Sequence, residues 1–279
     1  MRSLLFAVLL AVMAGASPAW CSPIFDTGSP DGRMAAGSRP GTTTEIEAAD
    51  DFLFSAPTLI TGGTFTGLLP IGVPLSSVTD VTVEIYRVFP LDSVNPPDNR
   101  VPTRVNSPSD NAFASRDSAV AGQLTFTTTL VNASFTAANS VLNGINPSPN
   151  QTTGGEGPVT GQEVQFSFTL PSGLNLAADH YFFIPQVQLA SGNFFWLSAP
   201  RPITGGTGPF SPDLQAWIRN TNLDPDWLRI GTDIVGGGTP PTFNMSFSLN
   251  GTTVPEPSAV LLIVTGLGLA MLFRRRRAS

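Results

Sequence analysis

Apolar and polar residues alternate strictly over several short stretches of this chain, and this two-residue period is the strongest constraint on its fold. The cleanest stretch is residues 164–170, where Val, Phe, Phe and Leu alternate with Gln, Ser and Thr. Residues 81–89 begin with the same pattern. The 27 glycines and 26 prolines are spread along the chain and interrupt any longer period, so the sequence predicts short strands joined by loops.

About nine such segments can be recognised, and no regular run of helices alternates with them. The predicted strands are residues 49–55, 58–66, 81–89, 124–130, 164–170, 181–189, 193–198, 227–235 and 242–250. One short helix is expected over residues 213–219, because Ser211 suits an N-cap and Pro212 the first helical position. We therefore predict an all-β fold, an antiparallel two-sheet β-sandwich of jelly-roll or immunoglobulin-like type with long loops.

Two connections carry expectations of their own. Ala190, Ser191 and Gly192 separate the strands 181–189 and 193–198 and suit a hairpin turn, while Pro185 places the first strand at a sheet edge or a bulge. Residues 89–123 contain five prolines and no sustained period. A connection of this length is either a functional loop or a mobile one.

The first residues have the form of a secretory signal peptide, which we assign to residues 1–21. Arg2 precedes an apolar run, and small residues follow, so that cleavage after Ala16, Ala19 or Cys21 fits the pattern. Trp20 stands where a lipoprotein signal has a small residue, which argues against lipidation of Cys21. A Gly-, Pro-, Ser- and Thr-rich stretch follows, and the sequence predicts a flexible leader over residues 22–45 and a folded ectodomain over residues 46–250.

The other end of the chain, residues 254–279, has a different composition. Pro255, Glu256 and Pro257 precede an apolar segment from Ala259 to Phe273, and Arg274, Arg275, Arg276 and Arg277 follow it. As a helix, this segment of 15 residues spans roughly 22 Å, which is shorter than the ~30 Å hydrocarbon core of a bilayer. The four arginines favour the cytoplasmic side, so the preceding residues are expected across the membrane.

A Pro-Glu-Pro motif, a short apolar helix and an arginine cluster in this order resemble the PEP-CTERM sorting signal of Gram-negative bacteria. The resemblance implies that the chain is a substrate of an exosortase, a membrane-embedded cysteine protease that recognises the tail and removes it. Pro255, Glu256 and Pro257 would be the recognised residues. The implied route is export, transient insertion in the inner membrane through residues 259–273, and delivery to the cell surface or the extracellular space. An ordinary single-pass anchor is the alternative, but such anchors are nearer 20 residues long.

The remaining body is strongly acidic. Five of the 14 basic residues and one of the 20 acidic residues lie in the two terminal signals, which leaves 9 against 19. This balance argues against nucleic acid as a partner. The only cysteine is Cys21, so no internal disulfide can form, and the core depends on apolar burial.

Candidates for chemistry are few. His180 is the only histidine, no Gly-x-Ser-x-Gly elbow is present, and one histidine with one cysteine cannot supply a usual zinc site. Asp50 with Asp51, and Asp224 with Asp226, are weak candidates for Ca²⁺. No cofactor is expected, and only a carboxylate-dependent hydrolase remains as an enzymatic alternative.

The function predicted from the sequence is that of an exported, non-catalytic surface or matrix protein. The family resemblance implies association with exopolysaccharide and biofilm. The alternative is a carbohydrate-binding module or adhesin with a ligand site in the Pro/Gly-rich loops. Aromatic candidates for contact with such a ligand are Trp196, Trp217 and Trp227, provided that they are exposed.

Overall fold

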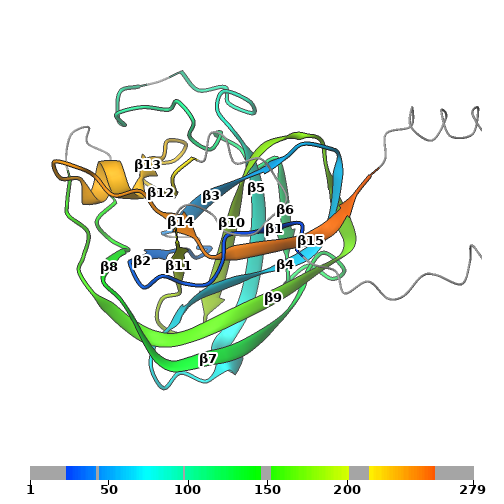
Figure 1. Cartoon of the computed structure of the whole chain (residues 1–279), viewed down its shortest axis with the longest axis horizontal. Helices are drawn as coiled ribbons and strands as arrows, with labels where there is room; N and C mark the ends of the chain where they lie inside the picture. The colour runs from blue at the N-terminus through cyan, green and yellow to red at the C-terminus, as the bar shows by residue number, and fades with distance from the viewer. Residues whose placement is uncertain (1–22, 42–43, 97, 146–151, 201–213, 255–279) are drawn as a thin grey trace, which may run out of the picture.

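The structure, a computed structural model, describes residues 23–41, 44–96, 98–145, 152–200 and 214–254 (Figure 1). Almost all regular structure in these ranges is β, in two sheets whose strands are mostly antiparallel. The prediction of an all-β fold with two packed sheets is confirmed at this level. The predicted signal peptide, residues 1–21, and the apolar segment 259–273 lie outside the described residues.

The larger sheet has nine strands and the order β1-β15-β4-β11-β2-β8, with β14 on β11, β9 on β4 and β7 on β9. Its members are β1 (Phe25–Asp26), β2 (Met34–Gly37), β4 (Thr58–Leu69), β7 (Thr125–Ala137), β8 (Asn139–Val141), β9 (Val159–Leu176), β11 (Phe195–Ala199), β14 (Asn244–Met245) and β15 (Phe247–Thr253). Among the strands of the described ranges, only β2 and β8 pair in parallel.

The smaller sheet has six strands in the order β13-β12-β3-β10-β5-β6. They are β3 (Ile46–Phe54), β5 (Val78–Arg87), β6 (Ala114–Asp117), β10 (Asp179–Leu189), β12 (Trp217–Asn220) and β13 (Leu228–Arg229). The helical turns are η1 (Leu75–Ser77) and η2 (Ile230–Val235).

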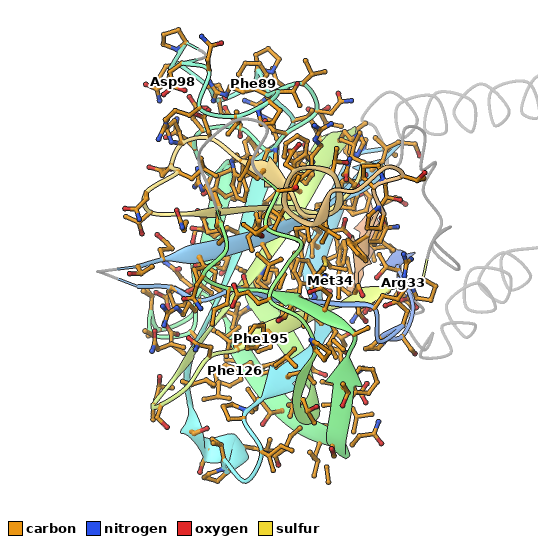
Figure 2. The ribbon with its side chains drawn as sticks, turned by 90° about the vertical axis from the view of Figure 1, so that its left-hand side faces the viewer. Arg33, Met34, Phe89, Asp98, Phe126 and Phe195 are labelled. Carbon is orange, nitrogen blue, oxygen red and sulfur yellow. The ribbon has the colours of Figure 1, made fainter. Side chains whose placement is uncertain are left out.

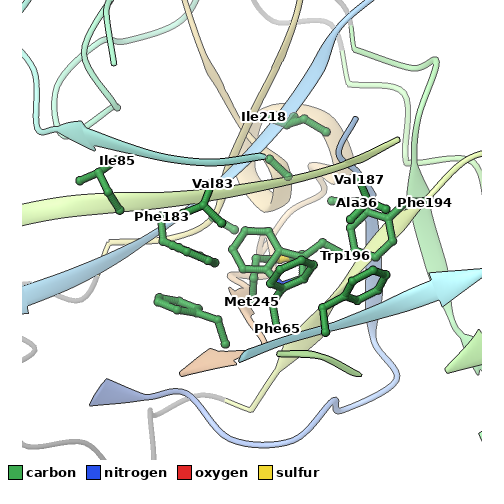
Figure 3. Packing of buried hydrophobic residues seen from close by; sticks show 14 of the residues in the cluster. Ala36, Phe65, Val83, Ile85, Phe183, Val187, Phe194, Trp196, Ile218 and Met245 are labelled. Atoms are coloured by element: carbon green, nitrogen blue, oxygen red, sulfur yellow. The ribbon is translucent and has the colours of Figure 1, made fainter. Parts of the chain in front are cut away.

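Aromatic side chains fill the space between the sheets (Figure 3). Phe183 of the smaller sheet stacks on Phe247 of the larger one with ring centroids 4.9 Å apart, and Trp196 meets both rings edge-on. The alternating residues of 164–170 behave as predicted, since the apolar members lie in this core. Burial of these large rings removes much apolar surface from water and is the main stabilising contribution in a chain without a disulfide.

The predicted flexible leader, residues 22–45, is wrong for much of its length. Phe25, Met34 and Ala36 are fully buried in strands β1 and β2. Ser38, just after β2, connects the two sheets, because its hydroxyl donates to the carbonyl of Pro185 over 2.5 Å and its own carbonyl accepts from Val187 N. The Gly- and Pro-rich composition of this segment gave no sign of the two short strands β1 and β2.

The predicted hairpin of residues 181–198 is also wrong. Strand β10 pairs with β3 and β5, whereas β11 pairs with β2, β4 and β14 of the other sheet. The chain therefore crosses between the sheets at residues 190–194. The prediction that Pro185 places this strand at a sheet edge or a bulge is also wrong, since β10 lies between β3 and β5 and Pro185 pairs in register with Val83 of β5. Pro185 lies two residues beyond Phe183, the last residue paired with β3, and its carbonyl accepts a hydrogen bond from the Ser38 hydroxyl.

The prediction of a helix over residues 213–219 is wrong where the structure describes this segment, since residues 214–216 belong to no helix or strand and Trp217–Asn220 form β12. The helical turn lies later, at η2, inside the range predicted as the strand 227–235. Pairing with β3 overrides the local preference for a helix, because it places Trp217 and Arg219 opposite Ala49 and Glu47.

Candidate functional site

The residues proposed for sorting lie outside the described residues. These are Pro255, Glu256, Pro257, Ala259, Phe273, Arg274, Arg275, Arg276 and Arg277. The structure does describe the chain up to the residue before the motif. Strand β15 ends at Thr253, and the backbone N–H of Val254 donates to the carbonyl of Pro57 over 2.7 Å.

The three tryptophans cannot form an exposed platform. Trp196, Trp217 and Trp227 are 0%, 2% and 1% exposed, so the prediction that they face a ligand is wrong. Trp196 packs between the sheets, and its indole N–H donates to Ser246 O. Trp217 and Trp227 pack on the outer face of the smaller sheet.

The aspartates that were predicted to bind calcium contact other groups of this chain. Asp50 accepts the backbone N–H of Met245 at 2.7 Å, and Asp51 lies 2.7 Å from His180 Nε2. Asp224 and Asp226 pair with arginines. Among the residues that the structure describes, no three or more His, Cys, Asp or Glu side chains are arranged to hold a metal ion.

A row of polar and charged side chains crosses the outer face of the smaller sheet, opposite the aromatic core. Strand alternation explains it: Ile46, Ala48, Val83 and Ile85 point inward, so Glu47, Glu84 and Tyr86 point outward. Arg219 of β12 is the direct cross-strand neighbour of Glu47. The sheet thus places a cation and two carboxylates around one phenol.

Arg219 is the centre of this row. Its Nε pairs with Glu47 Oε2, its Nη1 lies 2.8 Å from Asp224 Oδ1, and its Nη2 donates to the Tyr86 hydroxyl over 2.8 Å. The guanidinium carbon also lies 4.3 Å from the centre of the Trp227 ring. A planar guanidinium can satisfy all these directions at once, which a lysine could not do.

The long connection between β5 and β6 covers this face. In Figure 2 its residues Phe89 and Asp98 lie at one end of the molecule, far from Phe126 of β7. Arg104 fixes the connection to the sheet. It forms an ion pair with Asp110 within the connection, and its Nε lies 3.1 Å from Oδ1 of Asp226, which follows β12. Arg100 reaches the same Asp226 at 3.1 Å.

Burial and mutual repulsion perturb the acids of the site. Burial, followed by the negative charge of Glu47, raises the pKa of Glu84 to about 7. Burial also raises the pKa of Glu45, although its hydrogen bond from Gln186 acts to lower it. Tyr86 donates to Glu47 over 3.0 Å and lies 3.3 Å from Glu84, and its own pKa is raised by burial. Near neutral pH, Glu84 therefore changes between its acid and carboxylate forms.

A pocket of about 360 Å³ opens between this row and the covering connection. Its polar lining combines acceptors and donors: Glu45, Glu47, Tyr86, Asn95, Asp110, Asn111, Arg219, Thr221 and Asp224. Convergent polar groups of both kinds in a concave site orient a hydroxyl-rich ligand. A second, smaller pocket of about 220 Å³ lies on the larger sheet, beside Thr64, Gln165 and Ser248.

Sequence reasoning singled out Asp224 of this pocket and missed most of the others. Tyr86, and Glu84 beside the pocket, occupy the outward positions of a correctly predicted strand, which is a visible signal that they avoid the core. Arg219 is predicted on a helix, so no pattern in the sequence brings it to Glu47.

Comparisons of the chain with protein-family models, with curated proteins and with solved structures each found no match. No helix among the described residues is long and apolar enough to span a bilayer.

Proposed function

We propose that the chain is an exported, non-catalytic protein of the cell surface or extracellular matrix, sorted by an exosortase-type protease that acts at Pro255, Glu256 and Pro257. The folded body supports this proposal. Strand β15, the last described strand, ends at Thr253, and the motif begins two residues later at Pro255. Cleavage at the motif would therefore fall after the last described strand and would leave all described strands of both sheets in the released body.

Processing can be followed with one epitope tag before Pro255 and another after Arg277, in cells with and without the exosortase. We expect the first tag at the surface or in the medium and the second tag removed, but only in cells with the protease. Glu256→Ala should leave the chain at full length in the membrane fraction, whereas Ser258→Ala, a matched change beside the motif, should be processed normally. Both tags remaining on one membrane-bound species in normal cells would refute the proposal.

The pocket beneath the β5–β6 connection favours a second candidate function, the binding of a saccharide. Its lining offers carboxylate, amide, hydroxyl and guanidinium groups, and it lies in the Pro-rich loop region where the sequence placed a ligand site. Because the body carries 19 acidic against 9 basic residues, a neutral or basic glycan fits better than an anionic one.

A glycan array tests this second function. Ala112 lines the pocket and is half-buried, so Ala112→Phe should fill part of the space and abolish binding. Ala119→Phe makes the same change at an exposed site outside the pocket lining and should leave binding intact. Equal binding by the two variants, or no binding by the unchanged protein, would exclude the pocket as a saccharide site.

A further inference from the structure

We propose that two copies of this chain associate edge to edge through residues 125–130 of β7, which would extend the larger sheet across a two-fold axis. This interaction goes beyond sorting and saccharide binding. It would make the body an assembling unit of the surface layer in which it is proposed to reside.

Strand β7 is a long edge. Within the described residues its ladder partner is β9, and no strand pairs with its other side. The pairs from Thr125 with Thr169 to Leu130 with Val164 are in regular register, and shifts begin only after Leu130. Figure 1 shows β7 at the border of the sheet, outside β9. Six consecutive residues therefore present a regular backbone edge.

The other sheet borders in the described part of the chain are short or charged. Strand β1 has two residues, β8 three and β13 two, while β6 has four and carries Arg116 and Asp117. Natural proteins protect edges by such shortening and charge, because unpaired N–H and C=O groups otherwise attract another strand. The 13 residues of β7 contain neither a charge nor a proline.

The composition of the regular part also favours pairing. It reads Thr-Phe-Thr-Thr-Thr-Leu, with no glycine, and β-branched and aromatic residues have high strand propensity. A segment of about six such residues, uncharged and without proline, is the type that adds readily to another strand. Leu130 and Val131 at its end are 45% and 51% exposed, so association would also bury apolar surface.

Charge indicates a second copy as the occupant. Two acidic bodies repel each other, so they can meet closely only where neither carries charge, and β7 is such a strip. A basic partner would gain no electrostatic attraction from the uncharged strand β7. A two-fold axis perpendicular to the sheet runs the strands antiparallel and keeps equivalent faces on the same side. Threonines of one copy would then face threonines of the other, a favourable cross-strand pairing.

The test is analytical ultracentrifugation of the full chain in detergent over a range of concentrations. We expect a reversible dimer for the unchanged chain and dimerisation at least tenfold weaker for Thr127→Lys, which puts like charges together at the axis. Gln165→Lys is the matched control, because Gln165 is exposed on β9, which is paired on both sides. It should dimerise as the unchanged chain does.

Thermal unfolding of each variant shows whether it is folded, and Thr125→Lys replaces Thr127→Lys if the latter is not. Association through the apolar tail would survive the β7 substitutions. A monomeric unchanged chain, or equal dimerisation of the Thr127→Lys and Gln165→Lys variants, would overturn the proposal.

Discussion

Replacing Arg219 with methionine is expected to lower the free energy of unfolding by about 3–5 kcal/mol, because removal of one partner leaves a buried charge uncompensated. Arg219 and Glu47 are each only 6% exposed at their side chains. Without the guanidinium, the Glu47 carboxylate keeps only the Tyr86 hydroxyl among the partners described here. Urea unfolding followed by circular dichroism measures the change.

Three further variants isolate the charge effect. Glu47→Gln combined with Arg219→Met should be less destabilised than the sum of the two single changes, since the double variant has no unpaired charge between these positions. Arg219→Lys should lie between the unchanged chain and Arg219→Met. Arg116→Met should cost about 0.5 kcal/mol or less, because the Arg116 guanidinium donates to the neighbouring Ser115 carbonyl and forms no ion pair among the described residues. A loss below 1 kcal/mol for Arg219→Met would contradict the central role of this side chain.

Glu84 is expected to make the body less stable as the pH rises from 4.5 to 7. Its pKa in the folded protein, about 7, lies above the ordinary value of 4.5, so the folded state holds a proton that the unfolded state has lost. Stability is therefore full below pH 4.5 and falls through this window, and the loss is complete above pH 7. The total is about 3 kcal/mol. Glu84→Gln, which mimics the protonated acid, should abolish this loss and be more stable than the unchanged chain at pH 8.

Other acids titrate nearby, so the difference between the two proteins is the quantity to measure. The pKa values of Glu45 and Asp226 are also raised by burial, so both proteins carry a further pH dependence. Urea unfolding at pH 4, 5, 6, 7 and 8 gives the two curves. Glu156→Gln removes an acid elsewhere and should keep the fall between pH 4.5 and 7. Parallel curves for Glu84→Gln and the unchanged chain would show that Glu84 titrates normally.

The sequence predicted those elements whose local pattern agrees with their surroundings. Val164, Phe166 and Phe168 alternate because one face of β9 meets the core, so the period alone identifies the strand. Residues 81–89 are similar, since Glu84 and Tyr86 stand on the face opposite Val83 and Ile85.

The errors arise where long-range pairing overrides local composition. Residues 22–45 are rich in turn formers, yet Met34 and Ala36 are covered because β11 and β8 supply neighbours that no local window contains. Trp217 and Arg219 follow a good helix start but pair with β3, about 170 residues earlier in the chain. The pocket depends on such pairs, so the grouping of its residues could be recognised only from the structure.

Strand β15 lies between β1 and β4, and this position has a consequence for the proposed export and sorting. Its neighbours come from residues 25–26 and 58–65, so the larger sheet joins the first and the last described strands of the body. A chain that crosses a membrane N-terminus first leaves β1 and β4 without their common neighbour until residues 247–253 emerge. By then the segment next in line for the membrane is residues 254–279. The body would thus complete its fold only at the membrane surface, at the moment when the sorting motif becomes accessible.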